Sequence, residues 1–138
     1  MADDFDRACK YWSILRGTRR CPSWREMDMM ALPLRLVPWF SVIDEVGNGS
    51  DFIFRFFGTS RVRLQGRDYT GRSVKTLESG QLARKVAAEL VEVVERRKRM
   101  LYRTTVAKPD AGRRASYDIL RLPFSDGDDV NVVLNLVD

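Results

Sequence analysis

The chain has 138 residues, of which 44% are hydrophobic and 31% charged, and its net charge is +5. This length fits one domain with a sizeable core, and no run approaches the roughly 18 apolar residues that a membrane helix needs. The absence of histidine excludes Ser-His-Asp and Cys-His catalysis, and two cysteines cannot complete a zinc site.

The N-terminal residues, MADDFDRACKYW, are acidic and lack the apolar segment of a secretory signal, so we expect a cytoplasmic protein with two free cysteines. Apolar residues at helical spacing predict a first helix, which ends at Gly17: Phe5, Cys9, Trp12 and Leu15. Residues 17–38 contain three prolines and predict an irregular connector, with one helical turn near residues 25–30.

From residue 39 the pattern becomes that of strands. The segments WFSVIDEV and FIFRFF flank GNGSD, whose Asn-Gly pair is typical of a turn, and together they predict a hairpin. Strict alternation in the second strand predicts two faces: Phe52, Phe54 and Phe56 on one, and Ile53, Arg55 and Phe57 on the other.

Residues 58–77 predict short helical pieces, and residues 81–100 predict the longest helix. Three strands follow, MLYRTTVA, ASYDILRLPF and VNVVLNLV, joined by the turns KPDAGRR and SDGDD. This order predicts an α+β domain, in which a five-stranded antiparallel sheet carries helices on one face and an extra helix precedes the sheet.

Three segments are similar to those of a known family: YWSILRGTRRCPS, FRFFGTSRVRLQGRDYTGRSVKTL and LPFSDGDDVNVVLNLV. The central one contains R-x-x-G-T and G-R-D-x-T-G, and the chain thereby resembles a short bacterial single-domain family with the PAS fold. The resemblance implies one PAS-like domain over residues 1–138, with an N-terminal helix and connector at 1–36 and a PAS core at 37–138. Arg61 and Gln65 stand where that motif is usually apolar, which disfavours an apolar ligand.

In such a fold the space between the sheet and its helices is either a packed core or a pocket for a small ligand. We expect Gly58, Gly66 and Gly71 to permit tight reversals there, because glycine takes positive φ at little cost. The candidate ligand-binding residues are Phe54, Phe56, Val62, Leu64, Tyr69, Val74, Leu77 and Tyr117. A phosphate-binding loop is excluded because G-x-x-x-x-G-K-[ST] is absent.

The cofactor is unknown, and neither a flavin nor a haem is expected. No cysteine lies in a flavin-attachment context, and a haem would lack a proximal histidine. The acidic segment DGDD fits a solvated hairpin turn better than a magnesium site. We therefore expect the chain to act by binding and not by catalysis.

A run of cations ends the long helix: Arg96, Arg97, Lys98 and Arg99. Cations at this end complement the helix dipole, and an anion-binding patch is the functional alternative. Nucleic acid is a weaker candidate ligand, because no aromatic residues interleave with the run and no helix-turn-helix or RNA-recognition signature is present.

The sequence therefore predicts a non-enzymatic sensory or protein-interaction module in bacterial signalling, with a signalling protein as its partner and space for a small ligand. Phe5, Trp12 and Leu15 are candidate homodimer contacts, and the alternative is that their helix packs onto its own domain. The second functional hypothesis is an anionic-ligand or nucleic-acid binding protein that uses residues 96–99.

Overall fold

The computed structural model describes the backbone of residues 2–108 and 113–137, and the side chains of residues 3–104 and 116–137. The helices are α1 (Ala2–Arg16), α2 (Thr59–Gln65) and α3 (Gly80–Arg96), with the 3-10 turns η1 (Trp24–Glu26), η2 (Met29–Ala31), η3 (Leu34–Trp39) and η4 (Val74–Thr76). The strands are β1 (Phe40–Val46), β2 (Asp51–Phe57), β3 (Met100–Lys108), β4 (Arg113–Asp126) and β5 (Asp129–Val137).

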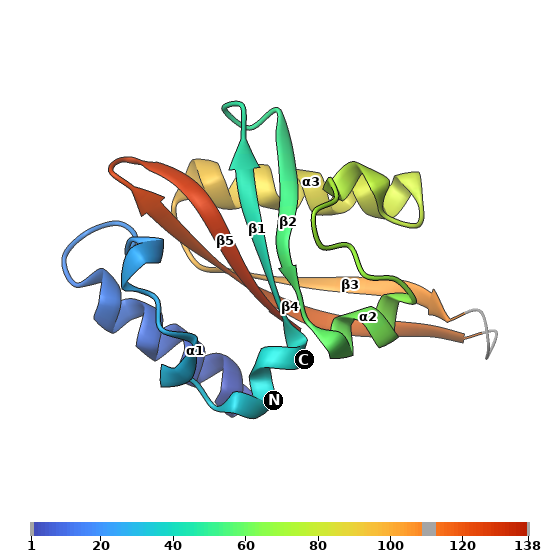
Figure 1. The fold of residues 1–138 in the computed structure, drawn as a ribbon, viewed down its shortest axis with the longest axis horizontal. Helices are drawn as coiled ribbons and strands as arrows, with labels where there is room; N and C mark the ends of the chain where they lie inside the picture. The colour runs from blue at the N-terminus through green and yellow to red at the C-terminus, as the bar shows by residue number, and fades with distance from the viewer. Residues whose placement is uncertain (1, 109–112, 138) are drawn as a thin grey trace.

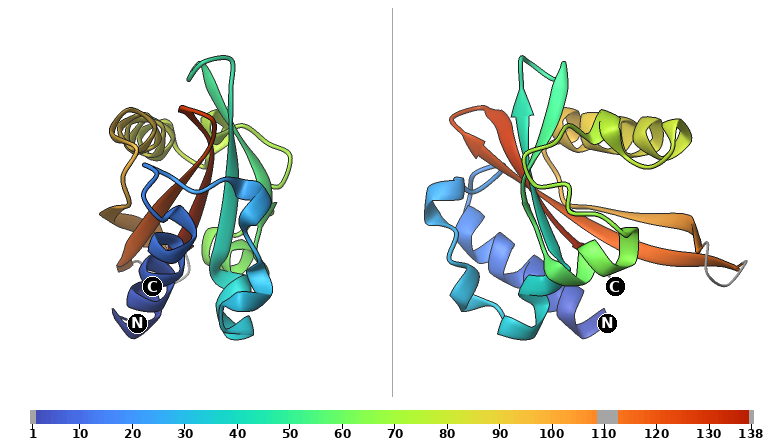
Figure 2. Two further views of the ribbon diagram at one scale, coloured as in Figure 1. Left: turned by 90° about the vertical axis from the view of Figure 1, so that its left-hand side faces the viewer. Right: turned by 45° about the vertical axis from the view of Figure 1, so that its right-hand side comes forward.

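The five strands form one antiparallel sheet in the order β2-β1-β5-β4-β3, so β5 is central and β2 and β3 are the edges (Figure 1). Helices α2 and α3 cover one face of the sheet, and α1 with the connector covers the other (Figure 2). The predicted α+β class, the antiparallel sheet and the additional N-terminal helix are confirmed. Within the described residues, no helix is long and apolar enough to cross a membrane.

Both faces of the sheet are buried at its centre. The alternation in β5 predicts one buried face, formed by Val130, Val132, Leu134 and Leu136, and these four side chains are indeed buried. Val133 and Asn135 on the opposite face are also buried, because α3 packs over that side of the strand. The sheet is therefore the middle layer of three, with a core on each side.

Trp12 holds α1 against the sheet. Its side chain is buried, and its indole Nε1 donates a hydrogen bond to the backbone oxygen of Pro123 at 2.7 Å. In the connector, Trp24 packs edge-to-face on Phe124 with ring centres 5.1 Å apart. Phe5 and Leu15 are partly buried against the same core, so in this structure α1 packs onto its own chain.

The predicted alternation in β2 is wrong beyond Phe54. Ile43 pairs with Phe54 while Val42 pairs with Phe56, so Arg55 is an extra, bulged residue. A bulge shifts the following side chains to the opposite faces. Phe57 therefore lies with Phe54 beneath the helices, and Phe56 lies on the α1 side of the sheet with 36% of its surface exposed.

Two predictions about local backbone need correction. The long helix ends at Arg96 and not at residue 100, because Arg97 adopts the left-handed conformation with φ 54° and the chain must turn into β3. Gly66 and Gly71 have the expected positive φ, of 78° and 80°. Gly58 has φ −63°, and it is required by close packing instead, because a Cβ there would meet the backbone oxygen of Pro38 at 2.2 Å.

Candidate functional site

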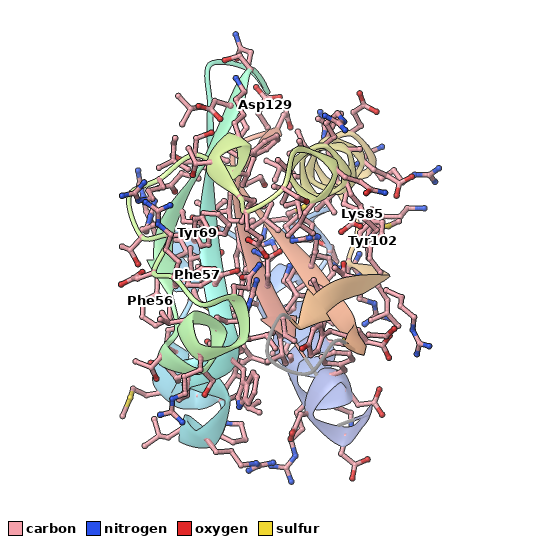
Figure 3. The ribbon with its side chains drawn as sticks, turned by 90° about the vertical axis from the view of Figure 1, so that its right-hand side faces the viewer. Phe56, Phe57, Tyr69, Lys85, Tyr102 and Asp129 are labelled. Atoms are coloured by element: carbon pink, nitrogen blue, oxygen red, sulfur yellow. The ribbon has the colours of Figure 1, made fainter. Side chains whose placement is uncertain are left out.

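Three aromatic rings form one wall of the space between the sheet and its helices. The ring of Phe57 lies 5.2 Å from that of Phe54 and 5.5 Å from that of Tyr69, measured between centres (Figure 3). The Tyr69 hydroxyl donates to Glu78 Oε2 at 3.0 Å. Burial raises the pKa of this phenol, and the hydrogen bond to Glu78 raises it further. The predicted polar group of Tyr69 is thus already engaged by the protein.

Most of this space is filled by side chains, but a small cavity of about 30 Å³ remains. Of the predicted ligand-binding residues, Phe54 and Leu77 line it, whereas Tyr69 and Val74 are buried in the surrounding core. Val62 and Leu64 on α2 are half-buried. Tyr117 on β4 is also half-buried, and its hydroxyl has no hydrogen-bond partner among the side chains that the structure describes. The β2 bulge keeps Phe56 out of this space.

The cavity wall is more polar than the candidate residues suggest. Its polar members are Ser41, Arg61, Gln65, Thr104 and Arg121, and its apolar members are Ile43, Phe54, Leu77, Leu82, Val86 and Ile119. The sequence signalled Arg61 and Gln65 through their departure from the family motif. Sequence reasoning missed Arg121, although a charge inside the apolar run ILRLPF was a usable signal.

Arg121 is 3% exposed and fully partnered. Its Nε and one terminal nitrogen donate to Glu89 Oε1 at 3.1 and 2.8 Å, and the other terminal nitrogen donates to Asn135 Oδ1 at 2.7 Å. Glu89 on α3 also accepts from Lys85. These bonds fasten α3 to β4 and β5 through a compensated ion pair.

A second polar group borders this network at the β3 edge. Lys85 donates to the backbone oxygen of Arg103 at 2.9 Å and to the Thr104 hydroxyl at 3.3 Å. The Tyr102 hydroxyl donates to Glu92, and burial together with this carboxylate raises the pKa of the phenol far above its ordinary value. Figure 3 shows Lys85 and Tyr102 near each other, at the side where α3 meets β3.

Arg61 is 7% exposed and differs from Arg121 in its partners. Its terminal nitrogens donate to Ser41 Oγ at 3.1 Å and to Gln65 Oε1 at 3.3 Å, both neutral oxygens. Its Nε has no acceptor among the described residues. The guanidinium carbon lies 5.0 Å from the centre of the Phe57 ring, so Arg61 makes a cation–π contact with this ring.

The basic run 96–99 divides between different parts of the molecule. Arg96 approaches Glu92 at 3.4 Å, and Arg97 approaches Asp129, the first residue of β5 and labelled in Figure 3, at 3.9 Å. Arg99 instead donates to the Ser13 hydroxyl of α1 at 3.4 Å. These three side chains therefore do not converge on one point. Lys98 is exposed.

Both cysteines are free thiols. Cys21 is buried and donates to the backbone oxygen of Arg97 at 3.5 Å, and burial raises its pKa to about 11. Neither thiol lines the cavity, and a cavity of about 30 Å³ lies far below the roughly 300–1,000 Å³ of pockets that hold cofactors of flavin or haem size. The described side chains also contain no cluster of metal-ligating type.

Comparisons with known proteins place these features in a family context. A family described as PAS domain matches residues 4–136. Among solved structures, the PAS domain of Bordetella pertussis BvgS has 14% identity and a TM-score of 0.57, over 96% of this chain and 85% of that chain. A fungal LOV domain photoreceptor has 14% identity and a TM-score of 0.54, over 81% and 78% of the two chains.

A third similar structure is that of the Vibrio cholerae VqmA dimer, in a study of LuxR-type receptors and their target DNA. It has 15% identity and a TM-score of 0.58, over 72% of this chain and 44% of that chain, so the similar region is less than half of VqmA. A search among curated proteins found no match. At these identities the structural matches show the fold alone.

Proposed function

Because this chain belongs to the PAS domain family, we propose that it is a cytoplasmic, non-enzymatic sensory module in bacterial signalling that binds a small ligand between α2, α3 and the sheet. One observation carries the proposal: the small cavity, whose wall includes buried polar groups from α2, β1, β3 and β4. A purely structural core would be expected to bury apolar groups there, since each buried polar group must be compensated.

Helix α2 is the element suited to respond to a ligand. It has only seven residues, and it contributes Arg61 and Gln65 to the cavity wall. Its start is held close to η3 at Gly58, so a shift of α2 is communicated to the connector on the other side of the sheet. A ligand that binds more tightly to one position of α2 shifts the population toward that position.

The signal then requires a contact with another protein. We propose that the α1 side of the sheet supplies it, either to a signalling partner or to a second copy. Two hollows of about 420 and 400 Å³ flank Phe5 on this side, and Leu101 on the edge strand β3 is 60% exposed beside one of them. The dimeric state of VqmA, which shares the fold, supports self-association as one form of this contact.

Native mass spectrometry tests ligand binding directly. The freshly purified protein is compared with its denatured mass, in a volatile buffer that preserves non-covalent complexes. A reproducible additional mass that disappears on denaturation is the expected result. A bare protein mass, unchanged after incubation with a library of small metabolites, would contradict the ligand-binding function and leave a purely protein-contacting role.

A further inference from the structure

Arg61 is a buried charge that has no buried counter-charge within the described part of the chain. Of the cationic groups around the cavity, Arg121 and Lys85 share Glu89, whereas no described carboxylate lies at ion-pair distance from Arg61. Glu78 is exposed and accepts the Tyr69 hydroxyl instead. Burying a guanidinium is costly unless it is paired, so this site has an excess of positive charge and an unused Nε donor.

The cavity beside Arg61 has the size of a small ion. Its volume of about 30 Å³ is roughly two to three times the 10–15 Å³ that one water molecule requires. Arg121 borders the same cavity. Burial, and after it the charge of Arg121, lowers the pKa of Arg61 to about 9, which leaves Arg61 charged at neutral pH. Ser41 and Thr104 add hydroxyl groups to the wall, which can donate hydrogen bonds.

We propose that this cavity binds a small monovalent anion, of the size of chloride, nitrate or formate, with Arg61 as its counter-charge. The inference rests on the proposed sensory function and assigns a chemical class to its ligand. An anion here supplies the acceptor that Nε lacks and offsets the mutual repulsion of Arg61 and Arg121. A larger acid does not fit the cavity unless α2 moves.

An anion in the cavity would also couple binding to the position of α2. Arg61 and Gln65 belong to α2, whereas Ser41 belongs to β1 and Arg121 to β4. An anion bound between them joins the short helix to the sheet by charge-assisted hydrogen bonds. Without it, the repulsion between two buried guanidinium groups favours displacement of α2 from the sheet.

Thermal unfolding at constant ionic strength tests the inference. Sodium gluconate, whose anion is too large for the cavity, is replaced stepwise by chloride, nitrate or formate. At least one small anion should raise Tm along a saturable curve, by roughly 5 °C or more at about 100 times its Kd. A Tm that changes only linearly, and equally for all three anions, would overturn the proposal.

Two variants that each remove one positive charge distinguish anion binding in the cavity from anion binding at the surface. Arg61→Met should abolish the saturable increase, and in gluconate its Tm should equal or exceed that of the wild type, because an uncompensated charge has been removed. Lys98→Met, which removes an exposed cation, should keep the full response. A response that survives in Arg61→Met would place the anion elsewhere and contradict the proposal.

A direct measurement on the wild type avoids dependence on a folded variant. Carbon-13 formate should show line broadening on addition of the protein, and an excess of the most effective anion from the Tm series should reverse it. If the broadening is absent and no anion raises Tm, the anion site is excluded. If native mass spectrometry nonetheless shows a neutral ligand, the sensory function stands and only the anion assignment fails.

Discussion

Glu89 is buried between α3 and the sheet and compensates two cations, the buried Arg121 and the exposed Lys85, since it accepts from both. Glu89→Gln keeps the shape but removes the charge, and it should reduce the free energy of unfolding by about 3–5 kcal/mol. Urea denaturation measures this loss. The wild-type slope of the free energy against urea concentration should be retained if the fold is intact.

Asp118→Asn is the matched control for that substitution. Asp118 pairs with Arg103 at 3.0 Å on the surface, where an ion pair contributes less than about 1 kcal/mol. Equal losses in the two variants would show that the buried pair has no special role. A double variant, Glu89→Leu with Arg121→Met, should recover much of the stability, because a matched apolar pair carries no desolvation penalty.

At the scale of elements, Gly58 sets the position of α2 against η3. Gly58→Ala would bring a Cβ to 2.2 Å from the backbone oxygen of Pro38, and backbone atoms cannot rotate away as a side chain can. The expected cost is about 1–3 kcal/mol, as for other overpacked sites, measured by chemical denaturation. Ser60→Ala on the same helix should change stability by less than about 0.5 kcal/mol.

A second readout makes the Gly58 prediction more specific. If α2 is displaced, any ligand-dependent increase in Tm should also weaken in Gly58→Ala, although this residue does not line the cavity. Unchanged stability in Gly58→Ala would mean that η3 and α2 separate easily. The proposed connection between the cavity and the connector would then be wrong.

The sequence predicted elements and their order better than it predicted faces. Periodicity and turn residues were sufficient for the hairpin, the long helix and the last three strands, because these signals are local. The bulge at Arg55 depends on pairing with β1 and has no local signature, so Phe56 was placed on the wrong face. Motif comparison identified Arg61, but only the folded chain shows that it shares a cavity with Arg121.

For the whole molecule, the proposed self-association through the α1 side of the sheet can be tested with a surface substitution. Leu101 is 60% exposed on this side, and Leu101→Glu should raise the dimer Kd by at least roughly 100-fold, because a two-fold interface loses the apolar contact twice. Light scattering coupled to size exclusion, with exchange between two tagged copies, measures this. Trp12 is an unsuitable probe, because it is buried within its own chain.

Val46→Glu provides the matched control for the surface change. Val46 is 44% exposed at the far end of β1, and its substitution should leave the dimer intact. A single-protomer mass for the wild type at all concentrations, with no exchange of tagged copies, would exclude self-association. The α1 side would then be available only to a different protein.

The central place of β5 has a consequence for how the protein is made. Strand β1 spans Phe40–Val46 and pairs on one side with β2, which follows it directly, but on the other side with Asp129–Val137. While the chain is being synthesised, β1 and β4 therefore remain unpaired on the edge that β5 will occupy. This edge stays open until β5 has emerged from the ribosome. Contacts so distant along the chain slow folding. The nascent chain is thus most exposed to aggregation just before β5 is completed.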